Sequence, residues 1–332
     1  MQYKTAKGFT GLGQLGILLV FFGLGLILAG GVQFIIGLQI IPAGIPFEKM
    51  GDVMMKALLD PQHVSYARLA QVLGAFFSLF VPAVLYSWIV NGRNKFWLGF
   101  NRHINIYQVL IGFAIIFFAN IMAAPLEELS KAAIAHLPSL DKMARELEKV
   151  YNDNVAALSN LKSWPEVIMA IFIMAFFPAI FEEVFFRGAI QNLLVKWWKT
   201  PLLAIVVSSL FFSLIHMSIY LFLSRAILGF ILGLLYYKTK NIWVNVIAHF
   251  LNNLLALIQL FYISTQKNQP DIIKPDAKIP WWLGLLALAL ILFFFRMLRK
   301  YSASNKEKID AQEQLILAKE NIYNPFANSE NN

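Results

Sequence analysis

Apolar stretches long enough to cross a lipid bilayer recur eight times along the chain. A membrane-spanning helix needs about 20 mostly apolar residues, and it must be a helix because the hydrocarbon offers no partner for an open backbone. The predicted spans are residues 11–41, 68–91, 105–125, 165–195, 202–222, 223–238, 242–264 and 280–298. The sixth stretch is the shortest, so seven spans are the alternative count. The sequence therefore predicts an all-α polytopic membrane protein, a bundle of about eight transmembrane helices.

The composition of the 332 residues excludes the soluble classes. Apolar residues make up 58% and charged residues only 14%, against about 25% charged residues in soluble domains. Disordered chains, coiled coils and ordinary soluble enzymes do not have this balance. The net charge of +9 is typical of Lys and Arg that flank spans. We therefore predict the lipid bilayer, and no nucleic acid, as a partner. Cysteine is absent, which excludes disulfides and thiolate chemistry.

Basic residues gather at alternating connections, namely the second, fourth and sixth. These connections contain Arg93, Lys95, Arg102, Lys196, Lys199, Lys238 and Lys240. The other connections carry most of the Asp and Glu outside the spans. The positive-inside rule then predicts that both termini are cytoplasmic. The predicted location is the cell membrane, as a multi-pass protein, which in a bacterium is the inner membrane.

One membrane domain is predicted over residues 1–300, with two segments outside the bilayer. Residues 126–163 place apolar side chains at helical spacing, which predicts an amphipathic helical insertion on the outer side or in the interface. The positions are Leu140, Met143, Leu147 and Val150. Residues 301–332 are polar and predict a partly helical cytoplasmic tail.

Ionisable residues inside spans cost about 2.5–3.5 kcal/mol each at mid-bilayer, so a function is expected of them. The fourth predicted span contains Glu182, Glu183 and Arg187. Glu183 and Arg187 are four residues apart with the acid first, the favourable order for an ion pair within a helix. Glu182 points about 100° away and has no local cation. A buried salt bridge that only fastens helices would explain Glu183 and Arg187 but not Glu182.

Two histidines lie in later spans. His216 is predicted in the fifth span, and His249 lies in the seventh, with Asn245 and Asn253 one turn away on the same face. A single histidine in a membrane helix is often only a hydrogen-bonded packing residue. Two His, one Asn and an unpaired Glu on successive helices are less easily explained by packing.

Together these groups allow peptide-bond hydrolysis without a covalent intermediate. A carboxylate and an imidazole can activate water, and a second His with an amide can stabilise the oxyanion. Other intramembrane proteases do not match. The sequence has no His-Glu-x2-His zinc helix, no Gly-x-Gly-Asp site and no Gly-x-Ser-x-Gly context at Ser213 or Ser218.

The motifs Glu182-Glu183-x3-Arg187, Phe212-x3-His216 and His249-x3-Asn253 resemble, in order, those of the CAAX protease and bacteriocin-processing family. These intramembrane endopeptidases, also called the abortive-infection family, are related to type II CAAX prenyl proteases. The resemblance covers about residues 165–260.

The resemblance implies an active-site cavity within the bundle and a role for each motif residue. Glu182 would be the general base and His216 would help to activate water. His249 and Asn253 would form the oxyanion hole, and Glu183 with Arg187 would support Glu182. The implied substrate is a membrane-associated protein or peptide, and the resemblance does not establish that it is prenylated.

The role of a metal is left open by the residues. Zinc is bound by His and Glu side chains, and Glu182, His216 and His249 would be its ligands. Asn253 is a poor zinc ligand and Arg187 adds positive charge, so we predict a glutamate mechanism with no cofactor and keep zinc as the alternative. The rival functions are a proton-coupled transporter, in which the same groups relay protons, and a catalytically silent scaffold.

Overall fold

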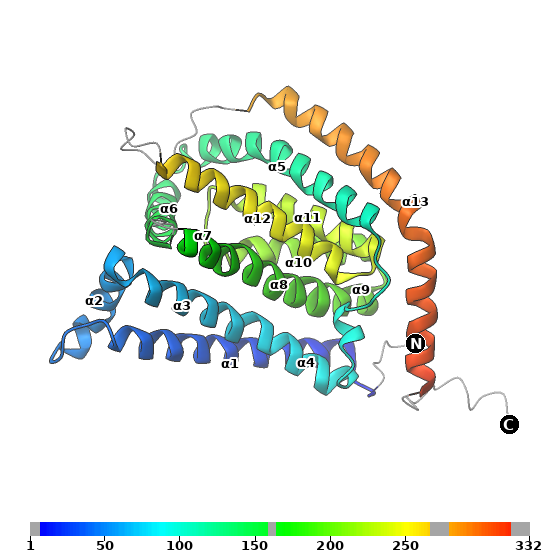
Figure 1. Cartoon of the computed structure of the whole chain (residues 1–332), viewed down its shortest axis with the longest axis horizontal. Helices are drawn as coiled ribbons and strands as arrows, with labels where there is room; N and C mark the ends of the chain where they lie inside the picture. The colour runs from blue at the N-terminus through cyan, green and yellow to red at the C-terminus, as the bar shows by residue number, and fades with distance from the viewer. Residues whose placement is uncertain (1–6, 159–163, 266–278, 320–332) are drawn as a thin grey trace.

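A computed structural model describes residues 7–158, 164–265 and 279–319 (Figure 1). The elements within these ranges are all helices. The first half of the chain contains α1 (Gly11–Leu38), α2 (Phe47–Leu59), η1 (Pro61–His63), α3 (Val64–Ala75), η2 (Phe76–Phe80), α4 (Val81–Asn91), η3 (Lys95–Leu98), α5 (Ile106–Ile134) and α6 (Pro138–Leu158).

The second half begins with one rod in which α-helix alternates with wider π-helical turns. The rod consists of α7 (Trp164–Ala170), η4 (Ile171–Phe176), α8 (Phe177–Glu183), η5 (Val184–Gln191) and α9 (Asn192–Trp198). After it come α10 (Pro201–Leu214), α11 (Phe222–Thr239), α12 (Ile242–Thr265) and α13 (Trp281–Lys319). The predicted all-α polytopic architecture is confirmed.

Within the described ranges, seven helices are long and apolar enough to cross a membrane, and α10 is a shorter apolar helix of 14 residues. The prediction that the sixth stretch is the short one is wrong. Residues 222–239 form a helix of 18 residues, whereas the fifth predicted span ends at Leu214, eight residues before its predicted end. The start of α1 and the ends of α4, α9 and α13 lie at one end of the bundle, and α2 and α6 at the other (Figure 1).

The boundaries of the insertion and the tail also differ from prediction. The first residues of the predicted insertion continue α5 as far as Ile134, so the separate helix α6 covers only residues 138–158. Residues 159–163 and 320–332 of the two predicted segments lie outside the described residues. The described part of the tail continues the last span as a single helix, α13.

Two-residue connections fix the antiparallel order of the helices around the site. Lys199 and Lys240 take up left-handed backbone angles, with φ of 56° and 52°, and their N–H groups close the last turns of α9 and α11. Pro201 then begins α10, a position where its missing N–H costs nothing. Each chain reversal therefore places the next helix beside the previous one.

Small residues let α10 and α11 approach closely. Gly229 and Gly233 are one turn apart on α11, and a β-carbon on Gly233 would lie 2.6 Å from Cγ2 of Ile205 on α10. A hydrogen bond from Asn120 on α5 to Asn252 sets the rotation of α12. These contacts bring α10, α11 and α12 around α8, where the polar motifs lie.

Candidate active site

Glu182 and Glu183 end α8, immediately before the π-helical turns of η5. Their side chains point to different environments. The Glu183 side chain is completely buried, whereas 15% of the Glu182 side chain is exposed. Single π-helical turns are frequent at functional sites, and here they begin at the residue that follows the pair.

Glu183 accepts hydrogen bonds from three side chains. Its Oε1 lies 2.9 Å from Arg187 Nη1 and 3.0 Å from His249 Nδ1. Its Oε2 accepts from Asn245 Nδ2 at 3.0 Å. A buried carboxylate is stable only when it is paired and hydrogen-bonded, so this set of donors holds Glu183 in its ionised form. The predicted ion pair between Glu183 and Arg187 is present.

Arg187 also connects this network to the neighbouring helices. Its Nη2 donates to the carbonyl of Gly229 on α11 at 2.9 Å. Its guanidinium carbon lies 4.9 Å from the centre of the Phe212 ring on α10. A buried guanidinium thus meets a carboxylate, a carbonyl and an aromatic face, which is the environment that Arg tolerates best.

His216 does not lie in a membrane helix as predicted. It follows the end of α10, in the loop of residues 215–221. Its ring Nδ1 lies 2.7 Å from the carbonyl of Phe212. The next residue, Met217, has a left-handed φ of 52°, a backbone strain typical of functional sites. The rings of Phe212 and His216 pack at a tilt, with 4.7 Å between their centres.

The imidazole Nε2 atoms of both histidines converge on Glu182. His249 Nε2 lies 3.8 Å and His216 Nε2 lies 4.0 Å from the same oxygen, Oε2. These separations exceed a direct hydrogen bond and suit a bridging water molecule.

Asn245 and Asn253 lie one turn before and one turn after His249 on α12. Asn245 is fully buried and donates to Glu183 and to the carbonyl of Leu232. Asn253 is half-buried and shares the helix face of His249. The distances therefore join Glu182, Glu183, Arg187, His216 and His249 directly, while Asn253 is placed by helical periodicity.

Helix α6 is fastened to the loop that carries His216. Tyr220 in this loop donates to Asp141 of α6, which also pairs with Arg145. The hydrogen bond from Tyr220 and the pairing with Arg145 hold the pKa of Asp141 below its ordinary value. The carboxylate therefore remains charged, and able to accept from Tyr220, as the pH falls into the mildly acidic range.

Arg225 of α11 makes a second connection between α6 and this loop. Its Nη1 donates to the carbonyl of His216 at 3.5 Å, and its guanidinium carbon lies 4.8 Å from the centre of the Tyr151 ring of α6. The other end of α6 is held by Arg68 of α3, which donates to the carbonyl of Leu158.

Sequence reasoning missed Arg68, Arg225 and the pair of Asn120 and Asn252. The available signal was the same as for Glu182, because each is a charged or amide side chain within a predicted apolar span. What the sequence alone does not contain is their partners, which are backbone carbonyls and side chains distant along the chain.

The chemistry of Glu182, His216 and His249 resembles that of a zinc ligand set, because both Nδ1 atoms contact acceptors as they do in metal sites. Within the described part of the chain, no group of three or more His, Cys, Asp and Glu is placed so that it could hold a metal ion.

Comparison with known proteins identifies the segment that contains this cluster. Residues 164–255 match the family model described as "Type II CAAX prenyl endopeptidase Rce1-like". The chain is 30% identical over 113 residues to a protein of Bacillus subtilis (strain 168) named "Putative membrane peptidase YdiL". This similarity covers 32% of the chain and 46% of that protein, so the chain spans about half the length of the relative. No solved structure matches the chain significantly.

Both matches agree with the resemblance predicted from the three motifs. The family model spans Glu182, His216, His249 and Asn253. The chain is thus a polytopic membrane protein in which residues 164–255 are similar to the type II CAAX prenyl endopeptidase family.

Proposed function

We propose that this chain belongs to the CAAX protease and bacteriocin-processing family and is an intramembrane endopeptidase that hydrolyses peptide bonds through a water molecule activated by Glu182. One observation carries the proposal. Two imidazole Nε2 atoms, from helix α12 and from the loop after α10, converge on a single carboxylate oxygen of α8 at 3.8 and 4.0 Å.

The contacts made by the Nδ1 atoms of the two histidines determine the state of the Nε2 atoms that face the Glu182 carboxylate. A carbonyl only accepts hydrogen bonds, so His216 Nδ1 carries the hydrogen that Phe212 accepts. Glu183 already accepts from Arg187, so it is ionised and His249 Nδ1 is likewise the donor. In their neutral forms both rings therefore turn an Nε2 lone pair toward Glu182.

Three acceptors that face one point favour a ligand with two hydrogens to donate. A water molecule held between Glu182 and the imidazoles satisfies this requirement and keeps its own lone pair for attack. Glu182 Oε2 takes a proton from the water as its oxygen bonds to the peptide carbonyl carbon. Glu182 then returns the proton to the amide nitrogen as the C–N bond breaks.

The oxyanion that forms in this step needs donors. Asn253 offers an amide N–H on the same helix face as His249. His249 Nε2 accepts from the water while the ring is neutral, and it can donate to the oxyanion only in the form that carries both protons. We assign Asn253 as the neutral donor and His249 as the charged donor.

Asn253→Ala should lower kcat by about 100- to 1,000-fold, because the loss of one oxyanion donor has this effect in other hydrolases. KM should stay near the wild-type value, since the donor acts on charge that develops only in the transition state. Steady-state cleavage of one peptide substrate measures both constants. A large rise in KM at unchanged kcat would instead place Asn253 in substrate binding.

The glutamate mechanism needs no metal ion. Purified protein should therefore cleave peptides in detergent after exhaustive chelation, and added zinc should not increase the rate. Activity that disappears with the chelator and returns specifically with zinc would contradict the mechanism and make Glu182, His216 and His249 metal ligands.

Proton-coupled transport is the second candidate, because Glu182 and the two histidines are titratable groups within a membrane bundle. Proteoliposomes distinguish the two functions. A transporter would dissipate an imposed pH gradient in the presence of its solute, whereas a peptidase releases new peptide termini without any gradient.

The orientation of the bundle is also a proposal, with both termini in the cytoplasm of a bacterial-type cell. Since the chain has no cysteine, single-cysteine variants can be labelled without background. Lys149→Cys on α6 should react with an impermeant reagent added outside whole cells, whereas Lys238→Cys on α11 should react only after lysis. The reverse pattern would invert the topology.

A further inference from the structure

The second half of α13 lies across the end of the bundle where α4 and α9 end (Figure 1). Ile309 is buried and packs with Phe96 and Trp97 of η3. Two ion pairs hold the same stretch, from Asp310 to Lys240 and from Glu313 to Lys196. This part of the predicted tail is therefore a helix docked on the membrane domain.

Aromatic and amide groups indicate where this helix meets the bilayer surface. Tyr301 of α13 stacks on Tyr107 of α5 with 4.8 Å between ring centres. Beside them, Gln108 donates to Ser302 at 3.0 Å, and Asn105 donates to the carbonyl of Tyr301. Tyr side chains gather at the level of lipid headgroups, so α13 reaches this level near Tyr301 and continues along it.

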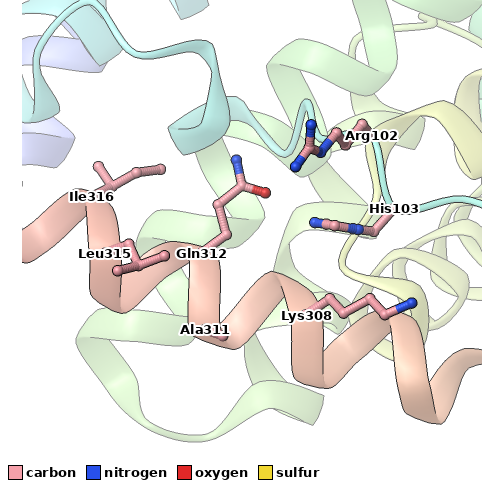
Figure 2. A pocket seen from close by; sticks show the side chains of 7 residues that line it. All are labelled: Arg102, His103, Lys308, Ala311, Gln312, Leu315 and Ile316. Carbon is pink, nitrogen blue, oxygen red and sulfur yellow. The ribbon is translucent and has the colours of Figure 1, made fainter.

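A groove of about 420 Å³ lies between the docked helix and the connection that precedes α5. The connection supplies Arg102 and His103. Figure 2 shows Gln312 rising from α13 into the space beside Arg102, with Lys308 one turn earlier on the helix. Ala311, Leu315 and Ile316 complete the lining. The groove thus combines cationic groups with an apolar floor.

The cations of this groove differ in their ion pairing from the neighbouring cations at the same end of the bundle. Lys196 and Lys240 at the same end of the bundle are paired with carboxylates of α13. For Arg102 and Lys308, by contrast, the described residues provide no carboxylate within salt-bridge distance. The Oε1 atom of Gln312 is buried and has no hydrogen-bond partner in the described part of the protein. Among the described residues, the groove therefore offers two cations without a carboxylate partner and an acceptor in need of a donor.

We propose that this groove binds the headgroup of an anionic glycerophospholipid. Arg102 and Lys308 contact the phosphate, Gln312 accepts from a headgroup hydroxyl, and the apolar floor takes the glycerol and the first acyl carbons. Basic pockets at the cytoplasmic surface of membrane proteins recognise anionic lipids by the same combination of charge and position. The site does not depend on the proposed peptidase activity.

Binding of phosphatidylglycerol to the purified full-length protein in neutral detergent tests this site. Arg102→Gln with Lys308→Gln should weaken binding at least about tenfold, because two charge-assisted contacts are lost. The matched control, Lys300→Gln with Lys306→Gln, removes the same charge from exposed positions of α13 and should bind within about twofold of wild type. The variant Arg102→Lys with Lys308→Arg exchanges the two basic residue types, keeps both charges and should retain binding. Retained binding would show that the groove tolerates substitution.

Three results would overturn the proposal. An equal loss in the Lys300 and Lys306 control would mean diffuse attraction to the basic surface. Equal affinity for phosphatidylcholine would mean that the anionic headgroup is not recognised. Displacement of the lipid by glycerol phosphate at matched concentration would assign the groove to a soluble phosphate compound, since the apolar floor would then contribute nothing.

Discussion

Glu182→Gln should lower the turnover of peptide cleavage by about 100- to 10,000-fold, the range that a general base contributes. The amide has nearly the shape of the carboxylate but cannot take a proton from water. The fold should persist, because Glu182 is partly exposed and the buried ion pair belongs to Glu183. Single-turnover kinetics measure the loss of cleavage. The melting temperature in detergent measures whether the fold persists.

An exposed carboxylate outside the cluster gives the matched control. Glu146 is exposed on α6, so Glu146→Gln makes the same chemical change and should leave turnover near that of wild type. Near-normal cleavage by Glu182→Gln would remove the general base from the mechanism. A collapse of its melting temperature would show that Glu182 has a structural role.

Glu183→Gln should destabilise the protein by about 3–5 kcal/mol, because it leaves a buried Arg187 without its counter-charge. The structure gives both side chains almost no exposure, with a separation of 2.9 Å between Nη1 and Oε1. Arg187→Met alone should have a similar effect, since it leaves the Glu183 carboxylate without its cation.

The double variant with both changes should recover part of this loss. Recovery should be incomplete because His249 and Asn245 also donate to Glu183 and lose a charged acceptor. A double-mutant cycle of unfolding free energies in detergent should give a coupling of about 1–3 kcal/mol. Activity should remain low in the double variant, because the Glu183 carboxylate no longer orients the His249 ring. Additive changes in stability would show that the two residues are not energetic partners.

Elements with a strong local signal could be predicted from the sequence. Long apolar runs specify membrane helices because hydrocarbon leaves the backbone no other structure. The four-residue spacing of Glu183 and Arg187 fixes an ion pair on one helix, which the structure contains. The order of the three motifs was likewise enough to indicate the family whose model matches residues 164–255.

The end of α10 could not be predicted, because it depends on tertiary contacts. Residues 215–221 contain no Gly or Pro to stop a helix, and their apolar character continues that of the span. The loop is instead held by Ser213 donating to the carbonyl of Phe222 and by Arg225 donating to the carbonyl of His216. These partners are nine residues apart and become neighbours only when α11 packs on α10.

The π-helical turns after Glu183 and the attachment of α6 could not be predicted from the sequence either, because they also depend on tertiary contacts. Amphipathic spacing predicts that α6 is a helix, but not that Tyr151 and Asp141 contact Arg225 and Tyr220. These contacts place the predicted insertion on the loop that carries His216. The attachment of α6 to this loop was therefore not readable from its composition.

Identification of new protein termini tests whether the protein cleaves peptide bonds through Glu182. Wild-type protein and Glu182→Gln, each purified and reconstituted with detergent-extracted membrane proteins of the source cell, would be compared by mass spectrometry of N-terminal peptides. We expect new N-termini, at or near membrane segments, with the wild-type protein and not with Glu182→Gln. Identical termini in both samples, or none with a folded wild-type protein, would contradict this expectation.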